Sequence, residues 1–342
     1  MGKESKVFVI FDGNAIIHRA YHALPPLTSR KIGLANAVYG FFLVFFKAIN
    51  DFKPDFAAVA FDFPAPNFRH SKYKLYKANR IKAPNELYEQ IPKTKEILKN
   101  FNIQIIEKKG YEADDVLGTI SKTAPKKHIY PMLKTIIVSG DMDVLQLVDK
   151  NTNVFALRKG VKDIVLYDEE KVKEKYGGLA PKELVEYKAL RGDPSDNIPG
   201  VFGIGEKTAI SLIREFKSID NLYDELKNNT DSAKKIKQNL KQKLVEYKEQ
   251  AYVSKMLAQI RHDADIDFDM DKCVWGNYDK EKIAEIFNEY GFKTLAARVL
   301  EKESKGVSKK EKPTAKHLFS PPFKKAKRQE KIPENNLNLW GN

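Results

Sequence analysis

Nine acidic residues sit just beyond short apolar runs or in one polar loop, and they are candidates for binding metal ions. They are Asp12, Asp62, Glu112, Asp114, Asp115, Asp141, Asp143, Asp193 and Asp196. Carboxylates crowded into one cleft repel one another, so they stay ionised only beside a counter-charge. Ligand sets made only of oxygen favour Mg²⁺ or Mn²⁺ over zinc. Two such ions, about 3.5–4 Å apart, activate a water and stabilise the leaving oxygen of a phosphodiester.

The elements that must position these acids are four short, β-rich apolar runs. They cover residues 6–11, 57–61, 102–106 and 135–139, and segments of helical length separate them. Such alternation predicts βαβ units, that is, an α/β fold with a mostly parallel, Rossmann-like sheet and helices on both faces. Ligands of open α/β sheets bind beyond the carboxyl ends of the strands, where these acids fall.

Each acid also has a simpler interpretation when it is taken alone. An Asp after a strand commonly caps the next helix or sits in a turn, which applies to Asp12 and Asp62. Asp193 precedes Pro194, a common turn arrangement. The metal site is favoured because four predicted strand ends are all acidic.

A basic and aromatic stretch follows Asp62. Residues 67–87 contain no acid before Glu86. At helical spacing Tyr73, Tyr76, Lys77 and Arg80 share one face. Cations for phosphates and rings for bases are typical of single-strand binding. The same stretch supplies the candidate DNA contacts Arg69, Lys72 and Tyr73. The alternative is a solvated basic helix.

A glycine-rich hairpin occupies residues 200–208. It contains Gly200, Gly203, Gly205, Lys207 and Thr208. A P-loop requires Lys directly after its last Gly, and Glu206 intervenes here. A hairpin between two helices, whose backbone approaches a DNA phosphate, is the better interpretation. The alternative is a plain helix–helix turn.

Composition restricts the class of protein. Lys and Arg total 60 against 46 Asp and Glu, a net charge of +14, which indicates a polyanionic partner such as nucleic acid. Cys273 is the only cysteine, so an internal disulfide and a cysteine-based zinc site are excluded. The longest apolar run, residues 38–46, is too short to cross a bilayer. We expect a protein of a reducing, cytoplasmic compartment without a membrane partner.

Three regions are predicted along the chain. Residues 1–168 would form the α/β domain, which includes the basic and aromatic stretch at about 64–90. Residues 169–300 would be helical, with the helix–hairpin–helix at about 184–216. Residues 301–342 form a basic stretch with four prolines, which predicts a disordered tail.

These motifs together resemble the 5′-nuclease (flap endonuclease) family, and most closely the N-terminal 5′→3′ exonuclease domains of bacterial DNA polymerase I. The motifs are FDGNAIIHRAYHAL, NAVYGF, FDFPAPNFRHSKYKLYKANR, GYEADDVLGT, SGDMDVLQLV and RGDPSDNIPGVFGIGEKTA, and the likeness covers about residues 6–300. The resemblance implies a PIN-like fold. It also implies hydrolysis of DNA and RNA-primer phosphodiesters at nicks, branches or 5′ flaps in replication and repair.

The resemblance assigns roles to particular positions. Asp12, Asp62, Glu112, Asp114 and Asp115 match the first metal cluster, and Asp141, Asp143, Asp193 and Asp196 match the second. Tyr76, Lys77 and Arg80 match the helical arch that faces the scissile phosphate. Residues 200–208 match a helix–hairpin–helix that holds K⁺ and grips duplex DNA.

Some alternatives stay open at this stage. The chain is either a stand-alone nuclease or part of a polymerase. Leu337, Leu339 and Trp340 resemble a sliding-clamp-binding peptide, against a tail attracted only to DNA. The competing function is a non-catalytic, tethering binder of branched DNA. A related PIN-type RNA nuclease is disfavoured, because those are shorter and lack the helix–hairpin–helix.

Overall fold

The structure is a computed structural model that describes residues 5–127 and 132–301. The predicted tail beyond Glu301, with its candidate clamp-binding residues Leu337, Leu339 and Trp340, lies outside the described residues.

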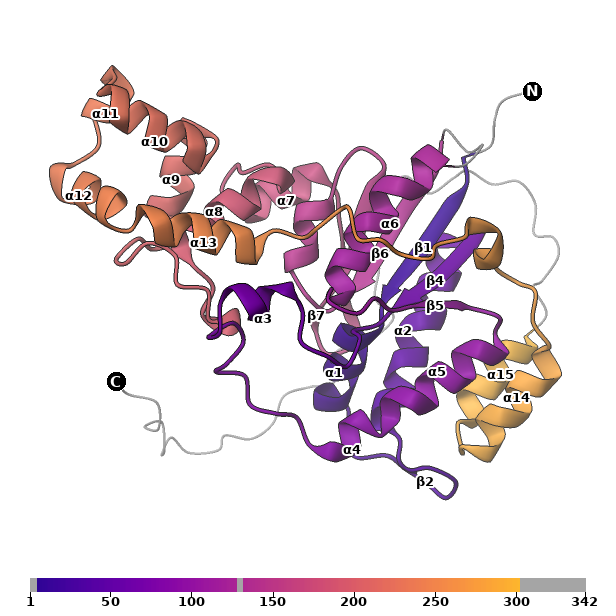
Figure 1. Cartoon of the computed structure of the whole chain (residues 1–342). Helices are drawn as coiled ribbons and strands as arrows, with labels where there is room; N and C mark the ends of the chain where they lie inside the picture. The colour runs from indigo at the N-terminus through magenta and orange to yellow at the C-terminus, as the bar shows by residue number, and fades with distance from the viewer. Residues whose placement is uncertain (1–4, 128–131, 302–342) are drawn as a thin grey trace, which may run out of the picture. The chain divides into compact units, whose positions relative to one another are not determined.

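A six-stranded sheet forms the centre of the described chain (Figure 1). Its order is β5-β4-β1-β6-β7-β8, and all neighbours are parallel except β7 and β8. The strands are β1 (Val7–Asp12), β4 (Phe56–Ala60), β5 (Gln104–Ile106), β6 (Lys134–Ser139), β7 (Thr152–Lys159) and β8 (Asp163–Tyr167). The predicted α/β class and all four predicted strands are confirmed.

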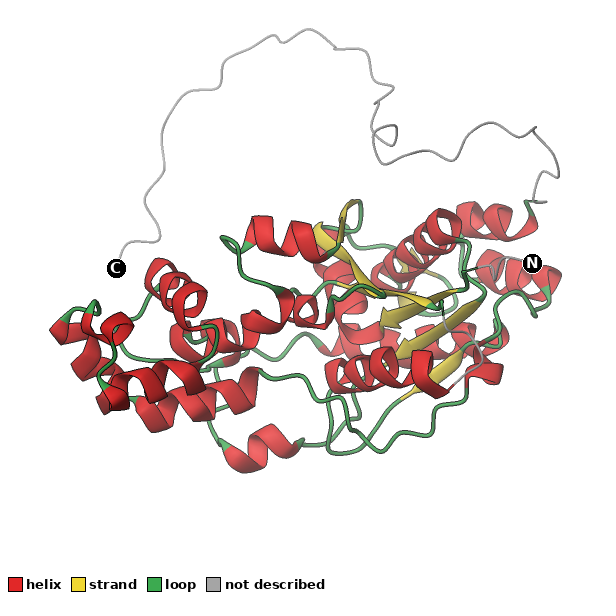
Figure 2. Cartoon of the chain, turned by 90° about the horizontal axis from the view of Figure 1, so that it is seen from above, coloured by secondary structure: helices red, strands yellow, loops and turns green. Residues whose placement is uncertain are grey.

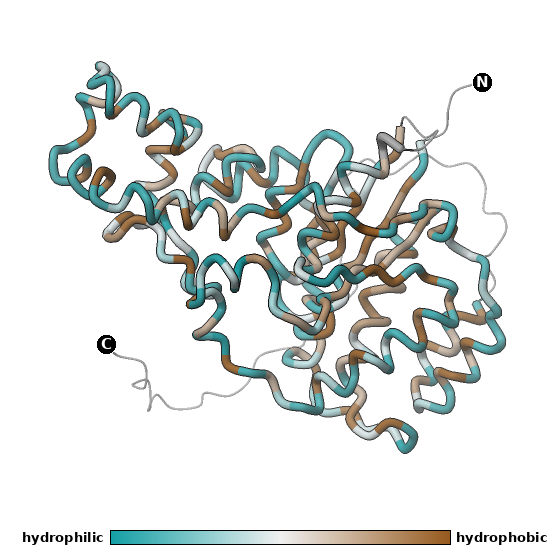
Figure 3. Tube along the Cα trace, viewed as in Figure 1, coloured by the Kyte–Doolittle hydropathy of each residue, from teal (hydrophilic) through white to brown (hydrophobic). Residues whose placement is uncertain are grey.

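Both faces of the sheet are buried. Side chains alternate along each strand, so successive residues enter different apolar cores. In β1, Phe8 and Ile10 join one apolar core, while Val9 and Phe11 join the other. Figure 2 shows the strands between layers of helices. Figure 3 shows the hydrophobic residues concentrated along the strands and the helices that cover them.

The Val9 face is covered by five helices. They are α1 (Gly13–Ala23), α2 (Asn36–Phe52), α5 (Gln90–Asn100), α14 (Lys280–Glu289) and α15 (Lys293–Leu300), and α2 among them carries five phenylalanines. The Phe42 and Phe287 rings, on α2 and α14, lie 5.2 Å apart between centroids. The last two helices therefore return to the sheet, although the sequence placed residues up to 300 in the helical region. The apolar faces of these two helices are buried in the core that contains α2.

The Phe8 face is covered by α6 (Ala113–Lys127) and by the helical region. That region contains α7 (Glu169–Lys175), α8 (Leu184–Arg191), α9 (Glu206–Phe216), α10 (Ile219–Asn228), α11 (Asp231–Lys234), α12 (Gln238–Glu246) and α13 (Lys248–Ala258). Helices α8 and α9 flank the glycine hairpin. Leu190 and Ile213 share one apolar core with Ile10, so the helical region is continuous with the sheet.

The predicted arch is not one helix, and this prediction was wrong. Only α3 (Phe68–Lys72) and α4 (Asn85–Tyr88) are helical, and turns occupy residues 74–79. Lys77 has a left-handed backbone with φ of 56°, so Tyr73, Tyr76, Lys77 and Arg80 do not share a helix face. Cations spaced three and four residues apart repel one another in a helix. Their side chains turn instead toward buried acids.

A β-hairpin of β2 (Thr28–Ser29) and β3 (Gly33–Leu34) precedes α2. Within residues 5–127 and 132–301, no helix is both long and apolar enough to cross a membrane.

Replacing Phe287 with Ala tests the return of α14 to the sheet. Phe287 is fully buried against Phe42 and Phe101. We expect a loss of about 3–5 kcal/mol in the free energy of unfolding, measured by urea denaturation. Val245→Ala, at a side chain that is 64% exposed, is the control and should change it by under about 0.5 kcal/mol. Equal effects would contradict the placement.

Candidate active site

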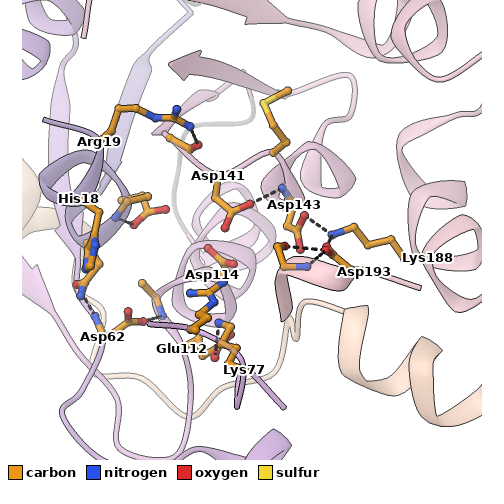
Figure 4. Close-up of a pocket in the computed structure, with 18 of the residues that line it drawn as sticks. His18, Arg19, Asp62, Lys77, Glu112, Asp114, Asp141, Asp143, Lys188 and Asp193 are labelled. Atoms are coloured by element: carbon orange, nitrogen blue, oxygen red, sulfur yellow. Dashed lines mark hydrogen bonds and ion pairs between the residues drawn. The ribbon is translucent and has the colours of Figure 1, made fainter. Parts of the chain in front are cut away.

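A cavity of about 620 Å³ opens beyond the carboxyl ends of β1, β4 and β6. Figure 4 shows acidic side chains converging on it from several elements. Seven of the nine predicted acids line it: Asp12, Asp62, Glu112, Asp114, Asp141, Asp143 and Asp193. The predicted convergence of strand ends is therefore present for six of them, and the seventh, Asp193, reaches the cavity from the loop after α8.

The sheet topology explains why the cavity forms at this point. After β1 the chain moves to β4 and β5 on one side, and then crosses to β6 and β7 on the other. Loops that leave neighbouring strands in opposite directions leave a crevice between them. Asp12 ends β1, and Asp141 follows β6 across that crevice.

Asp12 is both a helix cap and a member of the site. Its Oδ1 accepts the Ala15 amide at 3.0 Å, which caps α1, and its Oδ2 accepts the Ser139 hydroxyl at 2.6 Å. Burial, with the nearby charges of Asp62 and Asp141, raises the pKa of Asp12 to about 7. The capping interpretation and the site interpretation are compatible.

Asp62 and Asp114 line the same cavity, one after β4 and the other in the first turn of α6. Asp62 accepts the Ala113 amide at 2.8 Å, which fixes it against the start of α6. Burial raises the pKa of Asp62, and Glu112 adds to the rise. Burial also raises the pKa of Asp114 well above its ordinary value, followed by repulsion from Asp141 and Asp12.

Lys188 bridges the two acids at the other end of the cavity. Its ammonium lies 2.6 Å from Asp193 and also donates to Asp143. Burial, only partly offset by Lys188, raises the pKa of Asp143 to about 6. For Asp193, burial is outweighed by Lys188 and Ser195, which lower its pKa to about 2.

The basic stretch contributes three side chains to this acidic cluster. Lys77 Nζ donates to Glu112 at 2.7 Å, the Tyr76 hydroxyl donates to Glu112 at 3.1 Å, and Arg80 pairs with Asp196. Burial would raise the pKa of Glu112, but Lys77 and Arg69 outweigh it and lower that pKa. Asp196 is only 6% exposed and lies behind these cations.

Asp115 and Arg69 are placed differently from the prediction. Asp115 is fully buried, and Arg69 holds it through two hydrogen bonds of 2.7 and 2.8 Å. Its oxygens also accept the amides of Glu112 and Arg261. Arg69 further donates to the carbonyls of Leu257 and Gln259. Asp115 thus points away from the cavity, and the predicted DNA contact of Arg69 is wrong because its guanidinium is buried.

The remaining predicted contacts lie outside the cavity. Lys72 is exposed, and Tyr73 is half-buried beside Tyr76. In the hairpin, Gly203, Gly205 and Lys207 are exposed, Gly200 is buried, and Thr208 is intermediate. Gly200 and Gly203 have φ of 64° and 77°, which favour glycine.

Several basic residues in the cavity wall were missed in the sequence. They are His18, Arg19, His22, Lys188 and Arg191. Lys188 lies five residues before Asp193, and the need for a counter-charge near so many acids was the available signal. Arg19 is held by the Gly140 carbonyl at 2.8 Å, a contact that no spacing in the sequence indicates.

The carboxylate oxygens of the cavity acids are the kind of ligand that hard divalent cations prefer. Three cavity acids, Asp12, Asp62 and Asp114, have raised pKa values, and no cation of the described residues lies within ion-pairing distance of them. A divalent ion would relieve that repulsion. As placed, no three His, Cys, Asp or Glu side chains among the described residues are arranged to hold one ion.

The chain combines a doubly wound α/β sheet that carries an acidic crevice with a helical region that carries the glycine hairpin. Two family models match these two parts. The model "5′-3′ exonuclease, N-terminal resolvase-like domain" matches residues 7–177. The model "5′-3′ exonuclease, C-terminal SAM fold" matches residues 179–281. The chain belongs to the 5′-3′ exonuclease family.

Curated relatives are bacterial DNA polymerases I. The chain is 43% identical to that of Bacillus subtilis (strain 168) over 296 residues, covering 86% of this chain and 32% of the relative. It is 43% identical to that of Caldicellulosiruptor bescii over 295 residues, covering 85% and 33%. The chain spans about a third of the length of these relatives.

Solved structures share the fold. The T5 5′-exonuclease with bound zinc has a TM-score of 0.62 at 20% identity, covering 86% of this chain and 98% of that one. The catalytic core of Rad2 in complex with DNA substrate has a TM-score of 0.55 at 18% identity, covering 88% and 93%.

Arg69→Gln tests the structural role of the buried ion pair. It leaves the Asp115 carboxylate unpaired, so we expect a loss of about 3–5 kcal/mol in the free energy of unfolding, measured in urea. Lys72→Gln, three residues away and exposed, is the matched control and should be near neutral. A stable Arg69→Gln protein with weakened DNA binding would show instead that Arg69 acts at the surface.

Proposed function

We propose that this chain is a structure-specific 5′→3′ exonuclease and 5′-flap endonuclease that hydrolyses DNA phosphodiesters. The observation that carries the proposal is the cavity at the sheet's switch point, lined by seven acids and bordered by Lys77, Arg80 and Lys188. Several carboxylates in one cavity can hold the metal ions of cation-dependent hydrolysis, and the basic side chains around them can bind a phosphate group of the substrate. Membership of the 5′-3′ exonuclease family supports the same reaction.

The proposed cofactor is Mg²⁺, as two ions, with Mn²⁺ as a substitute. One would be held by Asp12, Asp62, Glu112 and Asp114, and the other by Asp141, Asp143, Asp193 and Asp196. When bound, the ions supply activation of a water and stabilisation of the leaving oxygen. The T5 5′-exonuclease, which is similar in fold, has been solved with metal ions and in a pseudo-enzyme-product complex with DNA and metal ions. Asp115 is excluded from this set by its pairing with Arg69.

The chain's own cations would orient the scissile phosphate. Lys77 and Arg80 now pair with Glu112 and Asp196, and arriving phosphate oxygens would compete for them. Tyr76, 3% exposed and bonded to Glu112 and Asp196, would hold both acids in place. Fixed donors aimed at developing negative charge are the main source of catalysis in such sites.

The proposed substrates are DNA with a 5′ flap, nick or branched junction, and an RNA primer paired with DNA. The hairpin of residues 200–208 would contact the duplex backbone. It would also hold K⁺, since backbone carbonyls and the Thr208 hydroxyl are neutral oxygen ligands of the kind that bind K⁺. A sliding clamp is a further proposed partner, through residues 337–340.

Asp62→Asn tests the catalytic role of the acidic cluster. It removes a negative charge while keeping the shape of the side chain. We expect cleavage of a labelled 5′-flap DNA in Mg²⁺ to fall on the order of 100-fold or more, with binding still measurable. Wild-type protein in EDTA is the control and should not cut. Cleavage at the wild-type rate by the variant would contradict the role of Asp62.

Lys77→Ala and Arg80→Ala test orientation of the phosphate. We expect single-turnover cleavage at saturating protein to fall about 100-fold, with the dissociation constant for flap DNA within about threefold of wild type. Lys74→Ala, exposed in the same turn segment, is the matched control and should cut normally. A weakened dissociation constant with an unchanged saturating rate would make both residues simple binding groups.

A further inference from the structure

We propose that Lys243 binds the phosphodiester backbone of duplex DNA beside the glycine hairpin, and that the ring of Phe202 orients it. Lys243 lies on α12, outside the hairpin motif. The inference rests on the proposed function, because it takes DNA as the partner. It adds a phosphate contact from a separate helix.

The hairpin is fixed so that Phe202 faces outward. Val201 and Ile204 are 2% and 4% exposed, whereas Phe202 between them is 68% exposed. Helix α13 fastens the base of the hairpin, since Ser254 Oγ accepts the Gly200 amide at 3.0 Å and Gln250 donates to the Gly200 carbonyl at 2.6 Å. The exposed ring therefore belongs to a rigid loop.

Lys243 is held against this loop by contacts with two of its residues. Its ammonium lies 5.8 Å from the centroid of the Phe202 ring, a cation–π geometry. A Cβ at Gly203 would collide with the same ammonium. The Tyr247 ring, one turn further along, lies 6.1 Å from Phe202. The side chain of Lys243 thus has a preferred position at the hairpin.

No anionic side chain in residues 5–127 or 132–301 pairs with this ammonium. Within the described residues Lys243 has no ion pair, whereas Lys255 of α13 pairs with both Glu186 and Asp220. The neighbouring Glu206 and Lys207 are exposed, and neither forms an ion pair in the described part of the chain.

Free backbone donors lie in the same loop. The amides of Phe202, Gly203 and Gly205 donate to no acceptor among the described residues. Unpaired amides in a tight turn, next to an unpaired ammonium, form an anion site. A phosphate bound there is positioned without reference to base sequence, so the expected ligand is the duplex backbone.

The test measures the affinity for a fluorescently labelled flap duplex by anisotropy, in EDTA, between about 50 and 200 mM KCl. Loss of one phosphate contact lowers the slope of log affinity against log salt by about 0.9. We therefore expect Lys243→Ala to lower the slope by about that amount and to weaken binding roughly fivefold at low salt. Lys243→Arg keeps the charge and should keep the slope.

Lys227→Ala is the matched control, because Lys227 on α10 is exposed and also has no ion pair among the described residues. It should leave the slope unchanged. An unchanged slope in Lys243→Ala, or an equal fall in both variants, overturns the proposal.

A double-mutant cycle tests the role of the ring. Phe202→Leu keeps the apolar bulk but removes the aromatic face, so it should weaken binding in the wild-type background and have little effect beside Lys243→Ala. Additive effects would overturn the orienting role. Cleavage of a 5′ flap by wild-type protein in Mg²⁺ is scored separately, so failure of the nuclease function and failure of the Lys243 contact are distinguishable.

Discussion

Repulsion among carboxylates in a buried crevice is the constraint on which the rest of the site depends. Burial alone disfavours the charged form of Asp12, Asp114 and Asp143, and the neighbouring carboxylates add to that cost. Basic side chains from other elements compensate part of this negative charge, with Lys188 at one end of the cavity and Lys77 at the other. The acids between these cations, Asp12, Asp62 and Asp114, keep raised pKa values, and strongly shifted pKa values are common at functional sites.

Hydrogen bonds at the starts of helices, which are common in α/β folds, hold the acids of this crevice in place. Asp12 caps α1, and the Asp62 carboxylate accepts an amide at the start of α6. Such hydrogen bonds stabilise the helix starts and fix the direction of each carboxylate at the same time. The acids are therefore held by the fold itself, although burial disfavours their charge.

A second ion pair organises the surroundings of the crevice. Arg69 and Asp115 lie in different segments, and their contacts with Leu257, Gln259 and Arg261 join both to the end of α13. The turn that carries Glu112 is thereby linked to the helical region that carries the hairpin. The proposed DNA contact at the hairpin and the proposed phosphate site at the crevice therefore belong to one connected framework.

The sequence by itself determined four of the six strands of the central sheet and the acids that follow them, but not β7 and β8. Short β-rich runs followed by Asp are local patterns, and a parallel sheet brings all its carboxyl ends to one edge. The roles of those acids remain proposals, but the convergence of the six that follow strand ends is expected from the pattern alone.

Tertiary structure decided what depends on partners distant in the chain. Asp114 and Asp115 are adjacent and chemically alike, yet one faces the cavity and the other faces Arg69, because consecutive residues on a helix point in different directions. The turn conformation of residues 74–79 follows from acids far along the chain, as the return of α14 follows from the apolar face of α2. The spacing of residues in the sequence does not predict such contacts, because the free energy that selects them comes from packing and charge pairing in the folded chain.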